Sequence, residues 1–319
     1  MTRPVVSVIL PTFNRSHLLP RAVQSVVDQT ITNWELIIVD DGSTDETASV
    51  VERYRPVLGN RLVYLRSATG QPAGASASRN RGIDRARGSF LAFLDSDDEF
   101  LPTKLERQLS LFRRRPDVAL VFSDMAASQI DGTWHDSWFA LHGQLIRSVP
   151  TEDLGDGQRF CGPDFVDYLV RGYLIPTITG LVRRDVLDDD VRFAPKQSYS
   201  EEWLFFLEIA RRGRCAFIDQ PLSVQYCQKQ SVSFSSAAHN IAQQYQALCQ
   251  IRQRFPRVSA DARRAIRDQI VHYCRQLGFD AYKQKRYRQA RSHFVEAWSN
   301  RPDLRGAAHV LQSLWRQVC

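Results

Sequence analysis

Residues 90–100 read FLAFLDSDDEF, and this stretch decides the fold. Its first five residues are apolar and show no helical spacing, which is typical of a strand buried on both faces of a parallel sheet. Four acidic residues follow almost at once: Asp95, Asp97, Asp98 and Glu99. In open α/β sheets, ligands bind at the carboxyl ends of the strands. The stretch therefore predicts a carboxylate site at one edge of a sheet.

The clustered acids have two interpretations. Neighbouring carboxylates repel one another and raise one another's pKa, and a bound divalent cation removes that cost. Carboxylate oxygens are hard ligands that suit Mg²⁺ or Mn²⁺. The alternative is an acidic turn that leads into the next helix, because Pro102 stands at a good first-turn position. These eleven residues leave both interpretations open, and the rest of the chain decides between them.

Strand and helix patterns alternate upstream of this stretch. Residues 5–10 and 35–39 are apolar runs that predict buried strands, and residues 62–65 predict a third. Residues 18–28 have apolar positions at helical spacing, and a second helix is expected to begin near Ser43 or Thr44. This alternation predicts a mostly parallel, doubly wound α/β sheet. The acids expected together at its rim are Asp40, Asp41, Asp95, Asp97 and Asp98.

Several classes of enzyme lack their signatures here. No G-x-G-x-x-G follows the first strand and no G-x-x-x-x-G-K-[ST] occurs, which argues against a dinucleotide oxidoreductase and a P-loop enzyme. An aspartyl-nucleophile phosphatase needs Thr or Val where Glu99 stands. A nucleotidyltransferase would also use a carboxylate–metal rim. It should show a glycine- and basic-rich stretch after the first strand, where this chain has PTFNR at 11–15.

The downstream half is less regular. A helix is expected over 102–115, a short helix over 163–172, and strands over 118–122 and 177–182. Residues 215–226 suggest a segment of an edge hairpin, and 125–160 allow no assignment. Ser200, Glu201 and Glu202 look like ordinary helix-start residues, since acids are favoured in a first turn. Residues 228–236 are a polar loop that could fold over a ligand.

Size and composition predict a globular protein. The chain has 319 residues, of which 43% are hydrophobic and 24% charged, enough for one large domain with an appendage or for two domains. No apolar stretch approaches the ~18–20 residues of a membrane span. The apolar run at residues 5–10 is too short for a signal peptide, so we expect a cytoplasmic protein. The 6 cysteines show no C-x-x-C spacing and are expected to be reduced thiols.

The C-terminal part is basic and helical. Residues 251–319 contain 15 basic and 5 acidic residues, a net charge of +10, whereas the first 250 residues carry −3. Such an excess suggests an anionic partner, such as a bilayer surface or an acidic polymer, or else only solvated helix faces. Residues 271–304 match one tetratricopeptide unit and no second copy follows. The positions that match are Leu277, Gly278, Ala290, Phe294, Ala297 and Pro302.

Several ordered blocks extend these patterns across most of the chain. They are SVILPTFNR (7–15), SVVDQT (25–30), WELIIVDDGSTDET (34–47), GASASRNRGI (74–83), GSFLAFLDSDDEFLP (88–102) and SEEWLFFLEIARRG (200–213). On these blocks the chain resembles a family 2 glycosyltransferase with the GT-A fold. The resemblance implies a catalytic domain over residues 1–236 and a helical extension over 237–319.

The resemblance also implies an activity. A family 2 enzyme transfers a sugar from a nucleotide-diphosphate sugar, here expected to be a UDP-sugar, to an acceptor hydroxyl with inversion. The expected acceptor is a sugar, glycan or lipid-linked glycan in surface polysaccharide or glycolipid synthesis. Peripheral contact with the cytoplasmic face of an anionic membrane is then reasonable, and no nucleic acid partner is expected. A helical-repeat interaction protein on an inactive domain is disfavoured, because every key acid is present.

Carried over residue by residue, the resemblance assigns the donor site first. Thr12 would line the nucleotide, Asp41 would hydrogen-bond the base, and Arg79 would lie near the donor. Asp95-Ser-Asp97 matches the D-x-D motif, with Asp95 toward the ribose and Asp97 on Mn²⁺ or Mg²⁺. Asp98 is the alternative metal ligand.

The acceptor side follows from the last block. Glu202 matches the catalytic base, where Asp is the commoner residue, and Glu201 remains the alternative. The family often has Tyr-Arg-x-His after the base helix, where this chain has YCQK at 226–229. The loop before residues 231–233 is also shorter than the loop of the family, so the sequence does not decide whether this loop closes over donor and acceptor.

Overall fold

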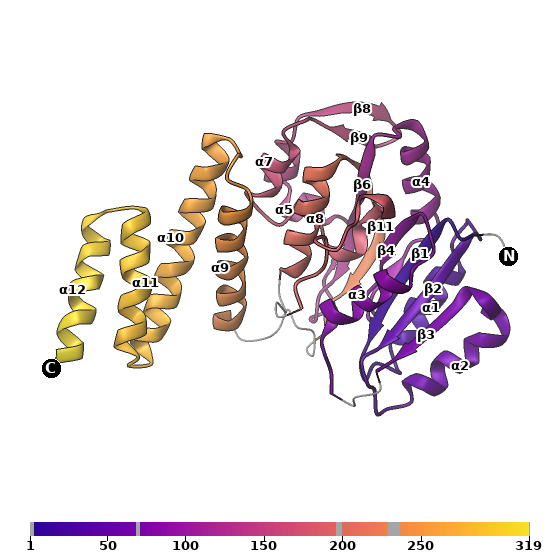
Figure 1. Cartoon of the computed structure of the whole chain (residues 1–319), viewed down its shortest axis with the longest axis horizontal. Coiled ribbons are helices and arrows are strands. Elements are labelled where there is room, and N and C mark those ends of the chain that lie inside the picture. The colour runs from indigo at the N-terminus through magenta and orange to yellow at the C-terminus, as the bar shows by residue number, and fades with distance from the viewer. Residues whose placement is uncertain (1–2, 68–70, 196–199, 229–236, 319) are drawn as a thin grey trace. The chain divides into compact units, whose positions relative to one another are not determined.

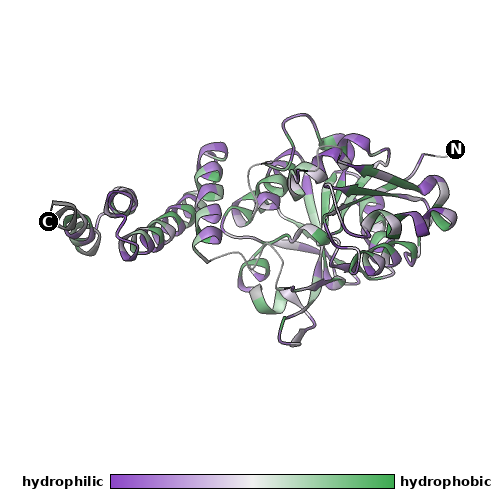
Figure 2. Cartoon of the chain, turned by 90° about the horizontal axis from the view of Figure 1, so that it is seen from below, coloured by the Kyte–Doolittle hydropathy of each residue, from purple (hydrophilic) through white to green (hydrophobic). Residues whose placement is uncertain are grey.

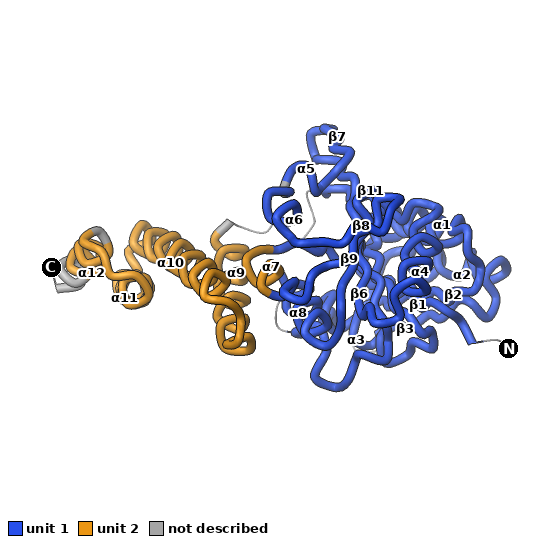
Figure 3. The backbone as a smooth tube through the Cα atoms, turned by 90° about the horizontal axis from the view of Figure 1, so that it is seen from above, with its two compact units in different colours: residues 1–166, 173–229 blue, residues 167–172, 230–319 orange. Residues whose placement is uncertain are grey.

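The computed structural model describes residues 3–67, 71–195, 200–228 and 237–318. The chain divides into two compact units, which Figure 3 distinguishes by colour. Unit 1 comprises residues 1–166 and 173–229, and unit 2 comprises residues 167–172 and 230–319. The predicted domain boundary after residue 236 and the predicted polar loop over 228–236 fall almost entirely on residues 229–236, outside the described residues. Both stay predictions.

Within the described residues, unit 1 is built on one sheet of 11 strands (Figure 1). Strands β1, β2, β3 and β4 run parallel to one another, as the alternating pattern predicts. The strands in sheet order are β3 (Leu62–Arg66), β2 (Trp34–Asp40), β1 (Val6–Thr12), β4 (Phe90–Phe93), β10 (Leu181–Arg183), β6 (Val118–Ser128), β11 (Arg214–Tyr226), β9 (Gln158–Cys161) and β8 (Thr151–Gly155). The short strands β5 (Glu99–Phe100) and β7 (Trp134–His135) pair with β11 and β6.

Helices connect the parallel strands and cover the sheet. Every residue of β1 and β2 is buried, because helices lie on both faces, and Figure 2 shows the sheet as largely hydrophobic. Helix α3 lies close to β1 because Gly82 has no side chain; a Cβ there would stand 2.4 Å from Cγ2 of Ile9. The helices of this unit are α1 (Leu19–Val27), α2 (Thr47–Leu58), α3 (Ala75–Arg85), α4 (Lys104–Arg114), α5 (Trp138–His142), α6 (Gln144–Arg147) and α8 (Glu201–Arg212). Helix α7 (Phe165–Leu169) crosses from unit 1 into unit 2.

Two predicted strands differ from the structure. Residues 177–179 form a 3₁₀ helix, and the strand starts only at Leu181, antiparallel to β4 and β6. The segment predicted as an edge hairpin is one strand, β11, which pairs in parallel with β6 and antiparallel with β9. Pro221 lies within this strand and has no N–H to donate to a neighbouring strand. The strand continues past it with register shifts on either side.

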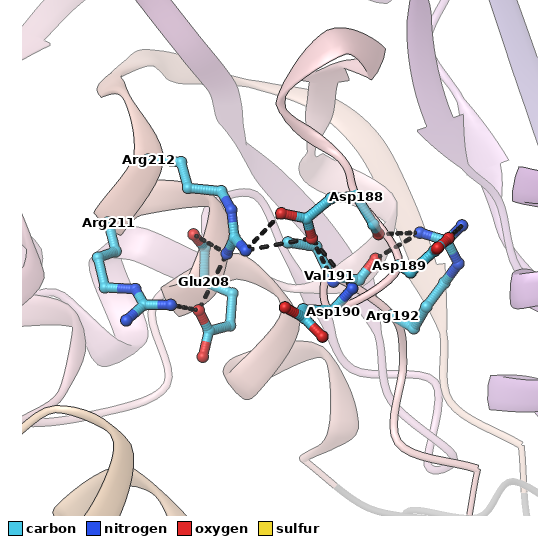
Figure 4. Close-up of polar contacts among 8 residues, drawn as sticks. All are labelled: Asp188, Asp189, Asp190, Val191, Arg192, Glu208, Arg211 and Arg212. Carbon is cyan, nitrogen blue, oxygen red and sulfur yellow. Dashed lines mark hydrogen bonds and ion pairs between the residues drawn. The ribbon is translucent and has the colours of Figure 1, made fainter.

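A cluster of acidic residues and arginines links the segment before α8 to that helix (Figure 4). Arg212 donates to both carboxylate oxygens of Asp188, at 3.1 and 2.8 Å, and also to Glu208. The Asp188 carboxylate also accepts hydrogen bonds from the backbone N–H groups of Asp190 and Val191. The hydrogen bonds from Arg212 lower the pKa of Asp188. This cluster ties the chain that carries Phe193 to helix α8.

Unit 2 is helical over its described residues. Its helices are α9 (Ala237–Arg254), α10 (Ala260–Lys283), α11 (Tyr287–Asn300) and α12 (Leu304–Val318). Gly278 of α10 lets Phe294 of α11 approach, since a Cβ there would stand 2.5 Å from its ring. No helix in the described ranges is long and apolar enough to cross a membrane. The tetratricopeptide assignment of residues 271–304 stays a prediction.

Candidate active site

The turn after β2 is organised by Asp40. Its buried carboxylate accepts hydrogen bonds from the backbone N–H groups of Gly42 and Ser43, at 3.1 and 2.7 Å. The hydroxyl of Tyr64 donates to the other oxygen at 2.6 Å. The Asp40 carboxylate therefore stabilises the conformation of this turn. The predicted N-caps of the next helix are not used: α2 begins at Thr47, whose N–H and hydroxyl donate to Asp45.

Asp41 and Thr12 lie beside this turn. The N–H of Asp41 donates to the carbonyl oxygen of Thr12 at 2.9 Å, and its carboxylate accepts the N–H of Gly74 at 2.7 Å. Gly74 has φ +92°, a conformation that favours glycine, and it precedes α3. The Thr12 hydroxyl is buried and has no hydrogen-bond partner among the described residues. The two predicted donor-site residues therefore lie together at the carboxyl ends of β1 and β2.

Arg79 joins both halves of the predicted site. This buried residue of α3 donates to Asp95 at 2.7 Å and to Glu201 at 2.8 Å, and its guanidinium lies 5.2 Å from the ring centroid of Phe193. Burial alone would lower the pKa of Arg79, but the two carboxylates outweigh it and raise that pKa. The D-x-D motif and the start of α8 are thus held by one guanidinium.

The acids after β4 bring like charges together around a buried carboxyl, Asp98. Asp98 is buried, and its carboxylate accepts the N–H of Tyr226 at 2.9 Å. Burial, then the charges of Asp97 and Asp95, raise the pKa of Asp98 well above its usual range, and nearby Arg21 only partly offsets this. A cation fits this donor set, because it would relieve the repulsion. Among the described residues no group of three His, Cys, Asp or Glu side chains is arranged as a metal site. The assignment of Asp97 and Asp98 as ligands stays a prediction.

Glu202 and Glu201 have different surroundings in the first turn of α8. Oε1 of Glu202 accepts a hydrogen bond from the hydroxyl of Tyr173 at 2.7 Å. Its buried Oε2 has no hydrogen-bond partner within the described ranges. Burial, then the charge of Glu201, raise the pKa of Glu202 to about 8. A carboxyl with one free oxygen and a pKa near neutrality is suited to accept a proton.

The start of α8 is not ordinary. Ser200 has a left-handed backbone, φ +62°, and its side chain makes no capping hydrogen bond. Glu201 is buried in the ion pair with Arg79. The interpretation of these residues as simple helix-start chemistry was therefore wrong for Ser200 and incomplete for Glu201. Tyr173 and Phe193 were missed, because neither stands in a block with a recognisable pattern.

A mostly parallel sheet with a carboxylate rim and a buried acid at the start of a later helix is the architecture of a GT-A type transferase. The chain belongs to glycosyl transferase family 2, whose model matches residues 7–167. The predicted fold class is thereby confirmed.

Relatives agree with this family. The chain is 39% identical over 132 residues to the putative teichuronic acid biosynthesis glycosyltransferase TuaG of Bacillus subtilis, which is 41% of this chain and 50% of TuaG. It is 30% identical over 233 residues to the uncharacterized glycosyltransferase YibD of Escherichia coli, 72% of this chain and 63% of YibD. It is 38% identical over 107 residues to WfgD of Escherichia coli, named as a UDP-Glc:alpha-D-GlcNAc-diphosphoundecaprenol beta-1,3-glucosyltransferase, 34% of this chain and 40% of WfgD. Each match spans less than two thirds of the relative.

Solved structures share the fold. S. aureus TarS in complex with UDP-GlcNAc superimposes with a TM-score of 0.64 at 18% identity, over 98% of this chain and 87% of that one. The mannosyltransferase PcManGT from Pyrobaculum calidifontis, in complex with GDP-Man and Mn²⁺, gives 0.58 at 15% identity, over 100% and 82%. At these identities the likeness concerns the fold alone.

Proposed function

We propose that the protein transfers a sugar from a UDP-sugar to an acceptor hydroxyl with inversion, and that Glu202 is the base. The observation that carries the proposal is the contrast between the two neighbouring acids. Glu201 is committed to Arg79, whereas Glu202 keeps one oxygen without a partner and has a raised pKa. The structure of TarS with UDP-GlcNAc supports the donor class by analogy of fold.

The donor side is assigned to the residues of the rim. Asp41 has one carboxylate oxygen on Gly74 and can accept a hydrogen bond from the nucleotide base with the other. The buried Thr12 hydroxyl offers a further group beside it. Asp95 is the partly exposed end of the Arg79 pair, and we assign it the contact with the ribose. Arg79 orients Asp95 through their 2.7 Å ion pair.

The chemistry follows from the position of Glu202. As the acceptor oxygen attacks the anomeric carbon, its proton passes to Oε2 of Glu202, and the bond to the diphosphate breaks. A single displacement inverts the anomeric carbon, and the transition state is oxocarbenium-like, as in other glycosyl transfers. General-base help of this kind typically contributes ~10²–10⁴ in rate.

Asp97 and Asp98 would hold a divalent cation. When bound, Mn²⁺ or Mg²⁺ stabilises the negative charge that develops on the leaving diphosphate. The like charges around Asp98 support this assignment, and PcManGT was solved with Mn²⁺.

The acceptor class is proposed from relatives. WfgD is named for a diphosphoundecaprenol-linked acceptor and TuaG for teichuronic acid biosynthesis. We assign this chain a glycan or lipid-linked acceptor in cell-surface glycan synthesis. The basic helices of unit 2 would then hold the enzyme against an anionic membrane surface.

One experiment tests the reaction class. Purified protein is incubated with UDP-glucose, UDP-galactose and UDP-GlcNAc in Mn²⁺, and the released product is identified. A glycosyltransferase releases UDP by transfer or by slow hydrolysis. A nucleotidyltransferase on a similar fold would instead exchange pyrophosphate with nucleotide sugars and release no UDP. Thermal shift identifies the donor beforehand, since a ligand at ~100 times its Kd adds about 2.7 kcal/mol of stability.

A further inference from the structure

Tyr173 is the direct partner of the proposed base. Its hydroxyl donates to Oε1 of Glu202 at 2.7 Å, although the two residues are 29 positions apart. Burial, then the carboxylate of Glu202, raise the pKa of Tyr173 well above its usual value, so the phenol stays protonated and remains the donor. Oε2 of Glu202 has no hydrogen-bond partner among the described residues, and we assign it to accept the substrate proton.

The ring of Tyr173 is itself held in place. Trp138, buried at the start of α5, meets it edge to face with centroids 6.0 Å apart and planes at 88°. An aromatic pair of this geometry is favourable beyond the area it buries. The Trp138 ring therefore restricts where the Tyr173 hydroxyl can point.

The start of α5 is fixed from the sheet. Asp124 of β6 is buried, and its carboxylate accepts the N–H of Phe139 at 2.9 Å and the hydroxyl of Ser137. Ser137 in turn accepts the N–H of Ala140 at 2.9 Å as the N-cap of α5. Trp138 lies between these anchored residues. A continuous set of contacts thus runs from the sheet through Trp138 and Tyr173 to Glu202.

We infer that Tyr173 is a positioning residue for the catalytic base, which fixes the Glu202 carboxylate and favours its ionised form. The inference rests on the proposed function. The charged groups near Glu202 are Glu201 in the same turn and Arg79 on α3. Their charges act on the pKa of Glu202 in opposite directions, and hydrogen bonds from its own backbone and from Tyr173 both lower that pKa. Of these two hydrogen bonds, the one from Tyr173 can be removed by a side-chain substitution.

The test is the pH profile of UDP release from the UDP-sugar that the wild type hydrolyses fastest. A hydrogen bond to the ionised form of a carboxyl favours that form, so its loss raises the pKa, and one pKa unit corresponds to a tenfold change in the ionised fraction well below the pKa. Tyr173→Phe should therefore move the acid limb of log kcat/KM to higher pH by about one unit. Its rate should fall about tenfold at pH 7 and recover in alkali. KM for the donor should change little.

A second variant guards against misfolding. Replacing Tyr173 with 3-fluorotyrosine keeps the shape of the side chain and makes its hydroxyl a stronger donor, so the acid limb should move to lower pH. Tyr54→Phe is the matched control, because the Tyr54 hydroxyl donates to the carbonyl oxygen of Pro20 at 3.2 Å and not to an acid of the site. The pH profile of this variant should match the wild type.

The outcomes separate the two proposals. If the wild type releases no UDP from any UDP-sugar, the proposed function fails. If it does, and the acid limb of both Tyr173 variants coincides with that of the wild type, Tyr173 does not position the base. A uniform loss of rate at every pH would likewise assign Tyr173 a purely structural role.

Discussion

Arg79 and Glu201 are 122 positions apart in the chain, yet Nη1 of Arg79 donates to Oε1 of Glu201 at 2.8 Å inside the protein. The second arm of the same guanidinium reaches Asp95. The planar fork of an arginine suits this double contact, which a lysine cannot reproduce. Arg79 therefore links Asp95, which follows β4, to the first turn of α8.

Replacing Arg79 should destabilise unit 1. Arg79→Met leaves Glu201 and Asp95 without a positive partner, and removing one partner of a buried ion pair typically costs 3–5 kcal/mol. Arg79→Lys should recover part of the loss because it restores the charge and not the fork. The measurement is urea unfolding. Arg81→Met on the same helix is the control, since Arg81 donates to the carbonyl oxygen of Arg66 in an exposed 3.3 Å hydrogen bond. An equal loss of stability in that variant would contradict the argument.

The strands and their acids were predictable from sequence because both are local properties. An apolar run of four to seven residues reports burial on two faces, and the acids that follow it must lie at its end. This reasoning placed Asp41 and Asp95 correctly at the ends of β2 and β4. It could not separate Asp40 from Asp41. That difference depends on Tyr64, whose hydroxyl reaches Asp40 from the neighbouring strand.

The second half of the site depends on contacts between distant residues. Tyr173 follows no strand or helix pattern, and its role appears only when the chain brings it to Glu202. Phe193 is placed by Asn80, whose amide exchanges two hydrogen bonds with its backbone at 2.8 and 3.0 Å. The place of β11 inside the sheet was not predictable from residues 215–226, because it depends on pairing with β6 on one side and β9 on the other.

The two neighbouring acids should respond differently to amide substitution. Glu202→Gln removes the base and should lower the transfer rate by ~10²–10⁴ with donor affinity nearly unchanged. Because the pKa of Glu202 is raised to about 8 and the base must be ionised, the wild-type rate should rise as pH increases through about 8. Glu201→Gln should mainly loosen Arg79, which lowers stability and donor affinity. Calorimetry with UDP and rate measurements separate these effects, and the reverse pattern would assign the base to Glu201.

Donor binding should depend on a divalent cation. Asp97→Asn should weaken Mn²⁺-dependent binding of UDP and abolish transfer while the melting temperature is kept. Asp98→Asn should make the metal-free protein more stable, because burial and the acidic neighbours disfavour a negative charge on Asp98. The measurements are UDP calorimetry with and without Mn²⁺ and thermal unfolding in EDTA. Full activity in EDTA would exclude this assignment.

Lys104 should make stability depend on pH. Its amine is fully buried, donates to Gln108 and to the carbonyl oxygen of Thr179 at 2.8 and 3.0 Å, and burial lowers its pKa from 10.5 to about 7. Between pH 7 and 10.5 the unfolded chain binds a proton that the folded protein does not, so this group makes the free energy of unfolding rise with pH. Below pH 7 the folded and the unfolded chain both bind the proton, so this group no longer changes the free energy of unfolding with pH.

Lys104→Met should therefore flatten the pH dependence of stability between pH 7 and 10.5 relative to the parent. Denaturant unfolding at several pH values measures this difference. Lys283→Met, at an exposed position of α10, is the control and should follow the parent curve. Parallel curves for parent and Lys104→Met would mean that the amine is charged in the folded protein throughout this range.

The basic helices should bind anionic membranes electrostatically. Residues 251–319 carry +10, and each basic residue near an anionic surface contributes about 1 kcal/mol. The attraction is screened over a Debye length of ~8 Å at physiological salt. The protein should therefore sediment with phosphatidylglycerol-rich vesicles at low salt, dissociate from them as salt rises, and not sediment with phosphatidylcholine vesicles.

Charge-reversal variants test which helices make the membrane contact. The exposed arginines to replace with glutamate are Arg257, Arg267 and Arg288. The matched control reverses Arg53, Arg85 and Arg113 of unit 1, which are also exposed and change the net charge equally. Loss of binding in the first triple variant alone would place the membrane contact on unit 2. Equal binding by both triple variants and the parent would mean that the basic helices are only a solvated structural extension.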